Sequence, residues 1–361
     1  MMYSFSDIKI LQLEISNHCN AACPQCPRKY FGGKTISTLP LNRWTLNDFK
    51  KLFTIELLSS IKEIYFCGTY GDPLTNLHIV DMCSFIKNAN SDIRVGIHTN
   101  GGAGKPDTFK QLARVTNFVA FGIDGLKDTN HIYRRNVKWN RILQNAEAFI
   151  SAGGTAIWDY IVFAHNEHQI NPARQLSQEL GFTDFTVKRT GRFLNRNHIY
   201  QDSMPVYNRN GFIDYSISIP DDSQYVNTGY QKINLIKQQN KSLQEYAKQT
   251  CISCNSKRIN EVYIGADGFV FPCGWLHDRL YGPEVENHKD HIKIKQLMVK
   301  AGGWDKVNVF HTPLKQIVDG DWFRVISESW TNEDRLERCG MMCGDGVDLI
   351  RSQNTEVEYK K

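Results

Sequence analysis

Strand-like and helix-like segments alternate from residue 8 to about residue 190, and this alternation limits the folds open to the chain. Short apolar runs rich in β-branched and aromatic residues alternate with longer stretches of helical period. Strands are expected at 8–15, 61–67, 93–98, 117–123, 155–163 and 184–188, and helices at 45–61, 77–88, 108–115, 139–153 and 170–180. Six such strands predict an α/β fold with a parallel sheet and right-handed crossovers, a partial (β/α)6 TIM-like barrel.

The rest of the chain departs from this pattern. Residues 1–190 are expected to form the barrel, and 191–250, rich in Asn, Gln, Tyr and Ser, a linker or substrate-facing insertion. Residues 251–346 bring a second group of cysteines and are expected to form a small cysteine-rich domain, with 347–361 as a frayed tail. Only about eight residues precede the first strand, so we expect no separate leader-binding domain before the barrel.

Charge and hydropathy indicate a cytoplasmic protein that does not bind nucleic acid as its main task. The chain has 43 Lys and Arg against 38 Asp and Glu, a net charge of +5, and its basic residues are scattered. Asp7, Lys9 and Glu14 interrupt what would be the apolar core of a signal peptide, and no later run approaches membrane-spanning length. Disulfides are disfavoured in a reducing compartment, so the clustered thiols among the ten cysteines indicate metal binding.

Three cysteines follow the first strand with the spacing C-x-x-x-C-x-x-C: Cys19, Cys23 and Cys26. A 4Fe-4S cluster held by three thiolates keeps one iron open for a small molecule. Zinc is the alternative, although His18 is the only further donor close by in sequence. Cys67 and Cys83 lie in apolar or amphipathic runs and are expected to be buried structural thiols.

The polar residues at the ends of the strands, together with this cysteine motif, resemble the radical SAM superfamily. GTYGDP at 68–73 is similar to the family's Gly-rich turn after the second strand, with Asp72 in place of the usual Glu. FGIDG at 121–125 is similar to the family's S-I-D-G, with Gly122 in place of Ser, and Arg134 falls where relatives place an arginine on the SAM carboxylate. The resemblance implies that S-adenosyl-L-methionine binds at Gly68, Tyr70, Gly71, Asp72, Pro73, Asn100, Gly122, Asp124 and Arg134.

The C-terminal cysteines extend the resemblance to the SPASM and twitch subgroups. The spacing from Cys254 through Gly268 to Cys273 matches their C-x(9–15)-G-x(4)-C pattern, and the surrounding residues suggest a β-hairpin that turns at 266–268. With Cys339 and Cys343, which lie about one helical turn apart, four thiolates could hold an auxiliary 4Fe-4S cluster and leave Cys251 spare. A structural zinc site on the same four residues is the alternative.

The resemblance implies reductive cleavage of SAM to a 5′-deoxyadenosyl radical, which abstracts hydrogen from a peptide or a small metabolite such as an aminocyclitol. An auxiliary cluster would assist oxidation or cross-linking, and a reductant such as flavodoxin or ferredoxin would supply electrons. Two other functions stay open: RNA modification, suggested by basic and aromatic runs such as VKRTGRFLNRNHIY, and a non-catalytic metal scaffold. The sequence does not name the substrate.

Overall fold

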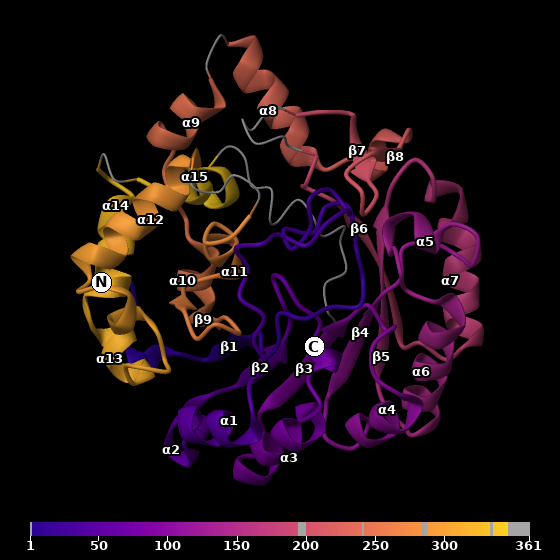
Figure 1. The fold of residues 1–361 in the computed structure, drawn as a ribbon, viewed down its shortest axis with the longest axis horizontal. Coiled ribbons are helices and arrows are strands. Elements are labelled where there is room, and N and C mark those ends of the chain that lie inside the picture. The colour runs from indigo at the N-terminus through magenta and orange to yellow at the C-terminus, as the bar shows by residue number, and fades with distance from the viewer. Residues whose placement is uncertain (1, 194–199, 240–241, 283–286, 333–334, 346–361) are drawn as a thin grey trace.

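The computed structural model describes residues 2–193, 200–239, 242–282, 287–332 and 335–345. Its centre is an eight-stranded sheet in the order β10-β9-β1-β2-β3-β4-β5-β6, which curves into an open barrel (Figure 1). Neighbouring strands from β9 to β6 are parallel, as the alternating sequence predicted. The strands are β1 (Ile10–Leu13), β2 (Glu63–Phe66), β3 (Arg94–Thr99), β4 (Phe118–Gly122), β5 (Ala156–Val162), β6 (Asp184–Arg189), β9 (Glu261–Ile264) and β10 (Val270–Phe271).

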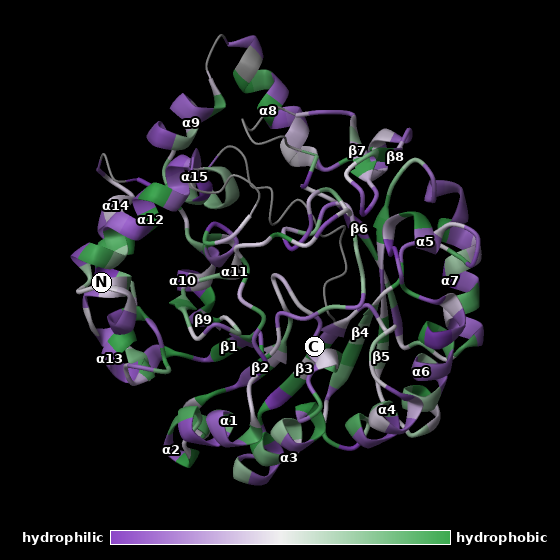
Figure 2. Ribbon diagram, viewed as in Figure 1, coloured by the Kyte–Doolittle hydropathy of each residue, from purple (hydrophilic) through white to green (hydrophobic). Residues whose placement is uncertain are grey.

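Helices cover the outer face of the strands from β2 to β6 (Figure 1). They are α1 (Leu46–Leu52), α2 (Ile55–Ser60), α3 (Ile79–Ala89), α4 (Pro106–Leu112), α5 (Asn130–Tyr133), α6 (Trp139–Ser151) and α7 (Ile170–Glu179). In Figure 2 most carry both apolar and polar turns, as expected for helices with one face on the sheet and the other in water. The partial (β/α)6 barrel is therefore confirmed.

The single helix expected at 45–61 is in fact two helices. Thr45 caps α1 and accepts a hydrogen bond from the Asp48 amide, and Thr54 caps α2 and accepts one from the Leu57 amide. A second capping threonine inside the segment lets the chain start a new helix. The apolar period of this stretch predicted its helical character but not the break.

Aromatic side chains fill the space between the helices and the sheet. The ring centroids of Phe49 and Phe53, near the start of the sheet, lie 4.6 Å apart, and both rings contact Trp44. The Trp44 indole donates a hydrogen bond to the Ala266 carbonyl. Further along the sheet, Phe109 of α4 stacks on Phe121 of β4 at 5.5 Å. These contacts are dense enough to fix the strand ends that carry the polar loops.

The cysteine-rich C-terminal region exists and is joined to the barrel by backbone pairing. β9 and β10 form the expected antiparallel hairpin, and β9 also pairs in parallel with β1, Leu11 opposite Val262. The other elements of this region are α10 (Asn255–Ile259), α11 (Gly274–His277), α12 (Lys289–Lys300), α13 (Leu314–Asp319), α14 (Asp321–Ser329) and α15 (Glu337–Cys343). This hairpin extends the barrel sheet by two strands.

The segment between barrel and C-terminal region has secondary structure of its own. It contains the antiparallel pair β7 (Ser203–Tyr207) and β8 (Ile213–Ser218), then α8 (Thr228–Gln238) and α9 (Leu243–Gln249). The expected tail at 347–361 lies outside the described residues, as does part of the basic run at 187–200. In the described part of the chain, no helix combines the length and the apolar character that crossing a bilayer requires.

Candidate active site at the open end of the barrel

The three N-terminal cysteines lie in the loop after β1 and line one cavity of about 380 Å³ at the carboxyl ends of the strands. The Ala21 amide donates to the Cys19 sulfur at 3.3 Å, and the Asn100 side-chain amide approaches the same sulfur at 3.6 Å. Ligand sites in parallel α/β folds collect at this end of the sheet. The loop therefore presents three thiols together where such a site is expected.

Burial disfavours the thiolate form of all three cysteines. Burial raises the pKa of Cys19 and Cys26, and raises that of Cys23 to about 11. Arg134 opposes the effect of burial on the pKa of Cys23, and the Arg28 backbone hydrogen bond together with the charges of Arg192 and Arg28 opposes it at Cys26. A cluster with thiolate ligands would therefore displace protons when it binds.

The Gly-rich turn at 68–73 packs so tightly that side chains do not fit at its glycines. A Cβ at Gly68 would lie 2.4 Å from the Gly71 carbonyl oxygen, and one at Gly71 would lie 1.8 Å from the Ser16 carbonyl oxygen. The turn thus lies directly against the backbone of the cysteine loop. This close approach is the physical reason for glycine at both positions.

Asp72 holds the next loop in place with its carboxylate. It accepts hydrogen bonds from the Leu74 amide at 3.0 Å, the Asn100 amide at 2.8 Å and the Thr99 hydroxyl at 2.9 Å. Burial raises the pKa of this carboxyl, and these hydrogen bonds oppose the increase. Asp72 therefore ties the turn after β2 to the loop after β3.

Arg134, Gly122 and Asp124 form one structural unit. The Arg134 Nε donates to Asp124 Oδ2 at 2.6 Å, and a Cβ at Gly122 would lie 2.4 Å from the Arg134 Nη2. The Asp124 Oδ1 also accepts from the Ile161 amide at 2.7 Å. Burial lowers the pKa of Arg134, but the adjacent Asp124 more than offsets this, so the guanidinium stays charged at the cavity wall.

Most of the residues implied by the sequence resemblance gather around this cavity. Its wall includes Cys19, Cys23, Cys26, Gly68, Tyr70, Gly71, Asp72, Asn100, Gly122 and Arg134. Pro73 and Asp124 are not part of the wall. Pro73 starts the 3-10 turn Pro73–Thr75, and Asp124 orients Arg134.

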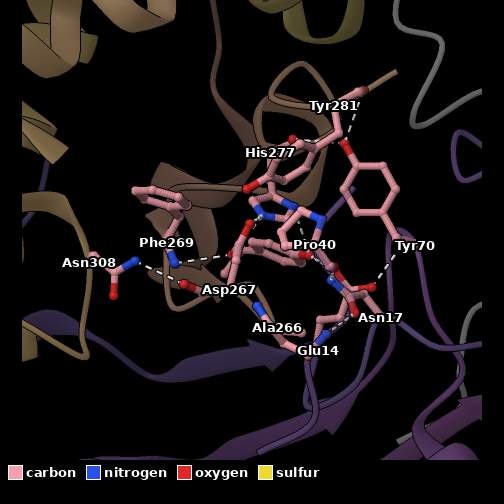
Figure 3. A network of polar contacts seen from close by, with 12 residues as sticks. Glu14, Asn17, Pro40, Tyr70, Ala266, Asp267, Phe269, His277, Tyr281 and Asn308 are labelled. Carbon is pink, nitrogen blue, oxygen red and sulfur yellow. Dashed lines mark hydrogen bonds and ion pairs between the residues drawn. The ribbon is translucent and has the colours of Figure 1, made fainter. Parts of the chain in front are cut away.

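The sequence analysis missed Glu14, which anchors the Gly-rich turn from below (Figure 3). Its Oε1 accepts the backbone N–H groups of Tyr70 and Gly71, each at 2.7 Å, and its Oε2 accepts the Tyr263 hydroxyl at 2.5 Å. Burial raises its pKa, while His277 and these hydrogen bonds oppose the increase. An acidic residue that directly follows an apolar strand was the signal available in the sequence.

The network continues into the C-terminal region through a buried histidine. His277 contacts the Tyr263 hydroxyl through Nδ1 at 3.2 Å and pairs through Nε2 with Asp267 at 3.0 Å (Figure 3). Burial lowers the pKa of His277, but Asp267 raises it above the ordinary value overall. The Tyr70 hydroxyl donates to the His277 carbonyl at 3.1 Å, so this helix end holds the turn at a second point.

The four C-terminal cysteines expected to act as ligands lie around a second cavity of about 300 Å³. Cys254 precedes α10, Cys273 precedes α11, and Cys339 and Cys343 lie one turn apart on α15. Burial raises the pKa of Cys254, Cys273 and Cys339. Cys251 is exposed and does not line this cavity.

The two cavities share a wall. Cys67, Gly68, Thr69 and Arg192 line both of them. Cys83 is buried as predicted, whereas Cys67 is only partly buried, because it lies at the end of β2 where the sheet opens onto the cavities. A molecule in the first cavity would therefore lie next to the second set of cysteines.

Three further polar residues in the first cavity were also missed: His98 of β3, Asp159 of β5 and Lys188 of β6. The Lys188 ammonium pairs with Asp159 Oδ2 at 2.5 Å, and His98 Nδ1 lies 3.8 Å from the same oxygen. Burial alone would raise the pKa of Asp159. Lys188 and His98 more than offset this effect and lower the pKa to about 2. Single polar residues within apolar strands were the only signal in the sequence.

Comparison with known families agrees with this geometry. Residues 13–171 match the model of the Radical SAM superfamily. This matched segment holds the cysteine loop and most of the partial barrel, so this part of the chain is similar to the radical SAM superfamily.

Known proteins resemble the chain at low identity. GTP 3′,8-cyclases from two strains of Staphylococcus epidermidis are 23% identical over 149 residues, which are 40% of this chain. Streptococcus suis SuiB bound to precursor peptide SuiA superposes with a TM-score of 0.55 at 14% identity, covering 97% of this chain and 75% of that chain. Native anSMEcpe with bound AdoMet and Cp18Cys peptide gives 0.54 at 16% identity, covering 96% and 91%.

The shared length differs between these comparisons. The chain spans 43% of the length of the curated cyclases, and 61% of a further SuiB structure. At these identities the solved structures establish a common fold.

We predict that Glu14→Ala destabilises the folded protein by about 3 kcal/mol, because two backbone N–H groups and the Tyr263 hydroxyl lose their acceptor. Each buried polar group left unpaired costs about 1 to 3 kcal/mol. Urea unfolding followed by circular dichroism would measure the change. Glu56→Ala, at an exposed glutamate of α2, is the control, and an equally small effect of both substitutions would contradict the prediction.

Proposed function

We propose that this protein is a radical SAM enzyme that modifies a peptide or a small metabolite. It would cleave SAM reductively at a cluster on Cys19, Cys23 and Cys26 and remove hydrogen from the substrate. The observation that carries the proposal is that these three thiols, the Gly-rich turn and Arg134 line one cavity. A non-catalytic scaffold would not require a turn and a fixed cation beside its thiols.

The residues around the cavity fit a 4Fe-4S cluster and SAM. When bound, the cluster supplies the electron that cleaves SAM and so generates the radical that abstracts hydrogen. Glu14 occupies the Tyr70 and Gly71 amides, so the SAM amino group, itself a donor, would bind carbonyl groups of the turn. Arg134, held by Asp124, would bind the SAM carboxylate.

We further propose that Cys254, Cys273, Cys339 and Cys343 hold an auxiliary 4Fe-4S cluster that assists oxidation or cross-linking. In a 4Fe-4S cubane each iron binds its own thiolate. A structural zinc ion instead binds all four sulfurs, each at a Zn–S distance of about 2.3 Å. Within the described ranges, no three Cys, His, Asp or Glu side chains are arranged to hold a single ion. A structural zinc site on the same four cysteines remains the alternative.

The comparisons support both substrate classes. The SuiB and anSMEcpe structures contain precursor peptide SuiA and the Cp18Cys peptide, which favours a peptide here. The relatives named as GTP cyclases favour a small molecule. A flavodoxin or ferredoxin is the proposed electron donor for either substrate.

The first test removes the three N-terminal thiols together. Anaerobically reconstituted protein should hold about eight irons, and Cys19→Ala/Cys23→Ala/Cys26→Ala should hold about four, as expected for loss of one of two clusters. The variant should make no 5′-deoxyadenosine with dithionite. Cys83→Ala, at a buried thiol outside both cavities, should keep both properties, and SAM cleavage by the triple variant would refute the proposal.

The second test compares two adjacent arginines. A charge-assisted hydrogen bond contributes about 1.5 to 3 kcal/mol, so Arg134→Ala should weaken SAM binding roughly tenfold or more. Arg135 pairs with Asp214 and does not line the cavity, so Arg135→Ala should leave the affinity unchanged. Isothermal titration calorimetry with cluster-loaded protein would measure both, and equal affinities would place the SAM carboxylate elsewhere.

The third test separates the spare cysteine from the proposed ligands. Cys251→Ala should keep the full iron content, while Cys273→Ala should lose iron and lower the melting temperature, because ligand loss removes binding energy that supports folding. Iron analysis and Mössbauer spectroscopy would distinguish the two variants. Stoichiometric zinc in anaerobically prepared wild-type protein, without a second iron-sulfur signal, would show that the site is structural.

A further inference from the structure

The carboxyl end of β6 makes one wall of the first cavity strongly cationic. Lys188, Arg189 and Arg192 all line the cavity, and Arg192 also lines the second cavity. We call this group the β6 wall. Counting the whole cavity lining, there are four permanent cations, these three and Arg134, but only two carboxylates, Asp72 and Asp159.

Neither carboxylate is available to balance the two arginines of the β6 wall. Asp72 accepts hydrogen bonds from the loop after β3, and Asp159 pairs with Lys188. Among the residues that the structure describes, no carboxylate lies within ion-pair distance of Arg189 or Arg192. Asp278 interacts with Arg192 over a longer distance, but its carboxylate pairs with Arg279 and Arg338. Arg189 Nε is buried without a hydrogen-bond partner, while Arg192 donates to the Gln25 carbonyl and lies 5.4 Å from the Trp275 ring.

Lys188 is fixed in position but still reaches the cavity. Its ammonium uses one donor on Asp159, and 26% of its side chain remains exposed to the open space. An ammonium has three donors, so the ion pair leaves Lys188 able to bind a further acceptor. Arg189 is partly buried and has no ion-pair partner, so an anionic ligand that enters the cavity would offset the cost of burying its charge. Arg192 is exposed, so its guanidinium can bind such a ligand without first leaving a partner carboxylate.

We propose that the substrate carries an oxyanion group, a carboxylate or a phosphate, that binds to the β6 wall at Lys188, Arg189 and Arg192. The inference rests on the proposed function, because it takes this cavity to be the substrate site. Since Arg192 borders both cavities, the bound oxyanion lies next to the shared wall. The reacting part of the substrate is then held between the two sets of cysteines.

Equilibrium dialysis with labelled acetate and labelled inorganic phosphate tests this inference on full-length, cluster-loaded protein. Saturating SAM fills the site of its own carboxylate, and labelled acetamide is the neutral control for acetate. Wild-type protein should bind at least one of the two anions and not acetamide. The anion that binds more tightly identifies the substrate group.

Two variants remove charge from the β6 wall. Arg192→Gln, and Lys188→Gln combined with Asp159→Asn so that no carboxylate is left unpaired, should each weaken anion binding about tenfold or more. Lys138→Gln, at an exposed lysine outside both cavities, should not change it. Circular dichroism and iron content confirm that each variant is folded and loaded.

Three results would overturn the inference: anions that bind no better than acetamide, variants that bind as wild type does, or binding that disappears when SAM is added. The last result would assign the cations to SAM itself. None of these readouts uses SAM cleavage, so their failure is distinct from failure of the radical chemistry. Wild-type protein that makes no 5′-deoxyadenosine would instead refute the proposed function.

Discussion

The buried carboxylate of Glu14 connects the parts of the chain on which the site depends. It accepts two amides of the Gly-rich turn and the hydroxyl of Tyr263, which is 249 residues away in sequence. Burying a carboxylate is costly unless hydrogen bonds compensate it, and here three do so. The carboxylate therefore stabilises one arrangement of the turn relative to β1 and β9, and the cavity wall follows from that arrangement.

The same contacts link the two groups of cysteines mechanically. α11 begins directly after Cys273 and ends at His277, whose carbonyl accepts the Tyr70 hydroxyl and whose ring contacts Tyr263. β9, the first strand of the hairpin that precedes α11, pairs with β1, which leads into the loop with Cys19. A shift of the second cavity therefore displaces the turn of the first one, so the geometry of the two sites is set together.

Local patterns in the sequence predicted the local structure well. Alternating periods identified all six barrel strands, and the Gly268 turn identified the hairpin, because these features depend on residues close in sequence. The cysteine spacings singled out seven of the eight thiols that line the two cavities; the eighth is Cys67. Roles that depend on neighbours across strands were not predictable: Glu14 is one polar residue in a strand-like run, and Asp159 and Lys188 come together only through the pairing of β5 with β6.

Gly122 shows how a departure from the family pattern can be explained by its spatial neighbour. The S-I-D-G pattern that this segment resembles has Ser at this position, but here a Cβ would lie 2.4 Å from the Arg134 Nη2. The guanidinium occupies that space because Asp124, two residues along the chain, binds its Nε at 2.6 Å. Gly122 thus leaves room for the Arg134 guanidinium that Asp124 holds. The cavity wall carries this fixed cation in place of a serine hydroxyl. A serine could return to this position only if the guanidinium moved, so the two positions are constrained together.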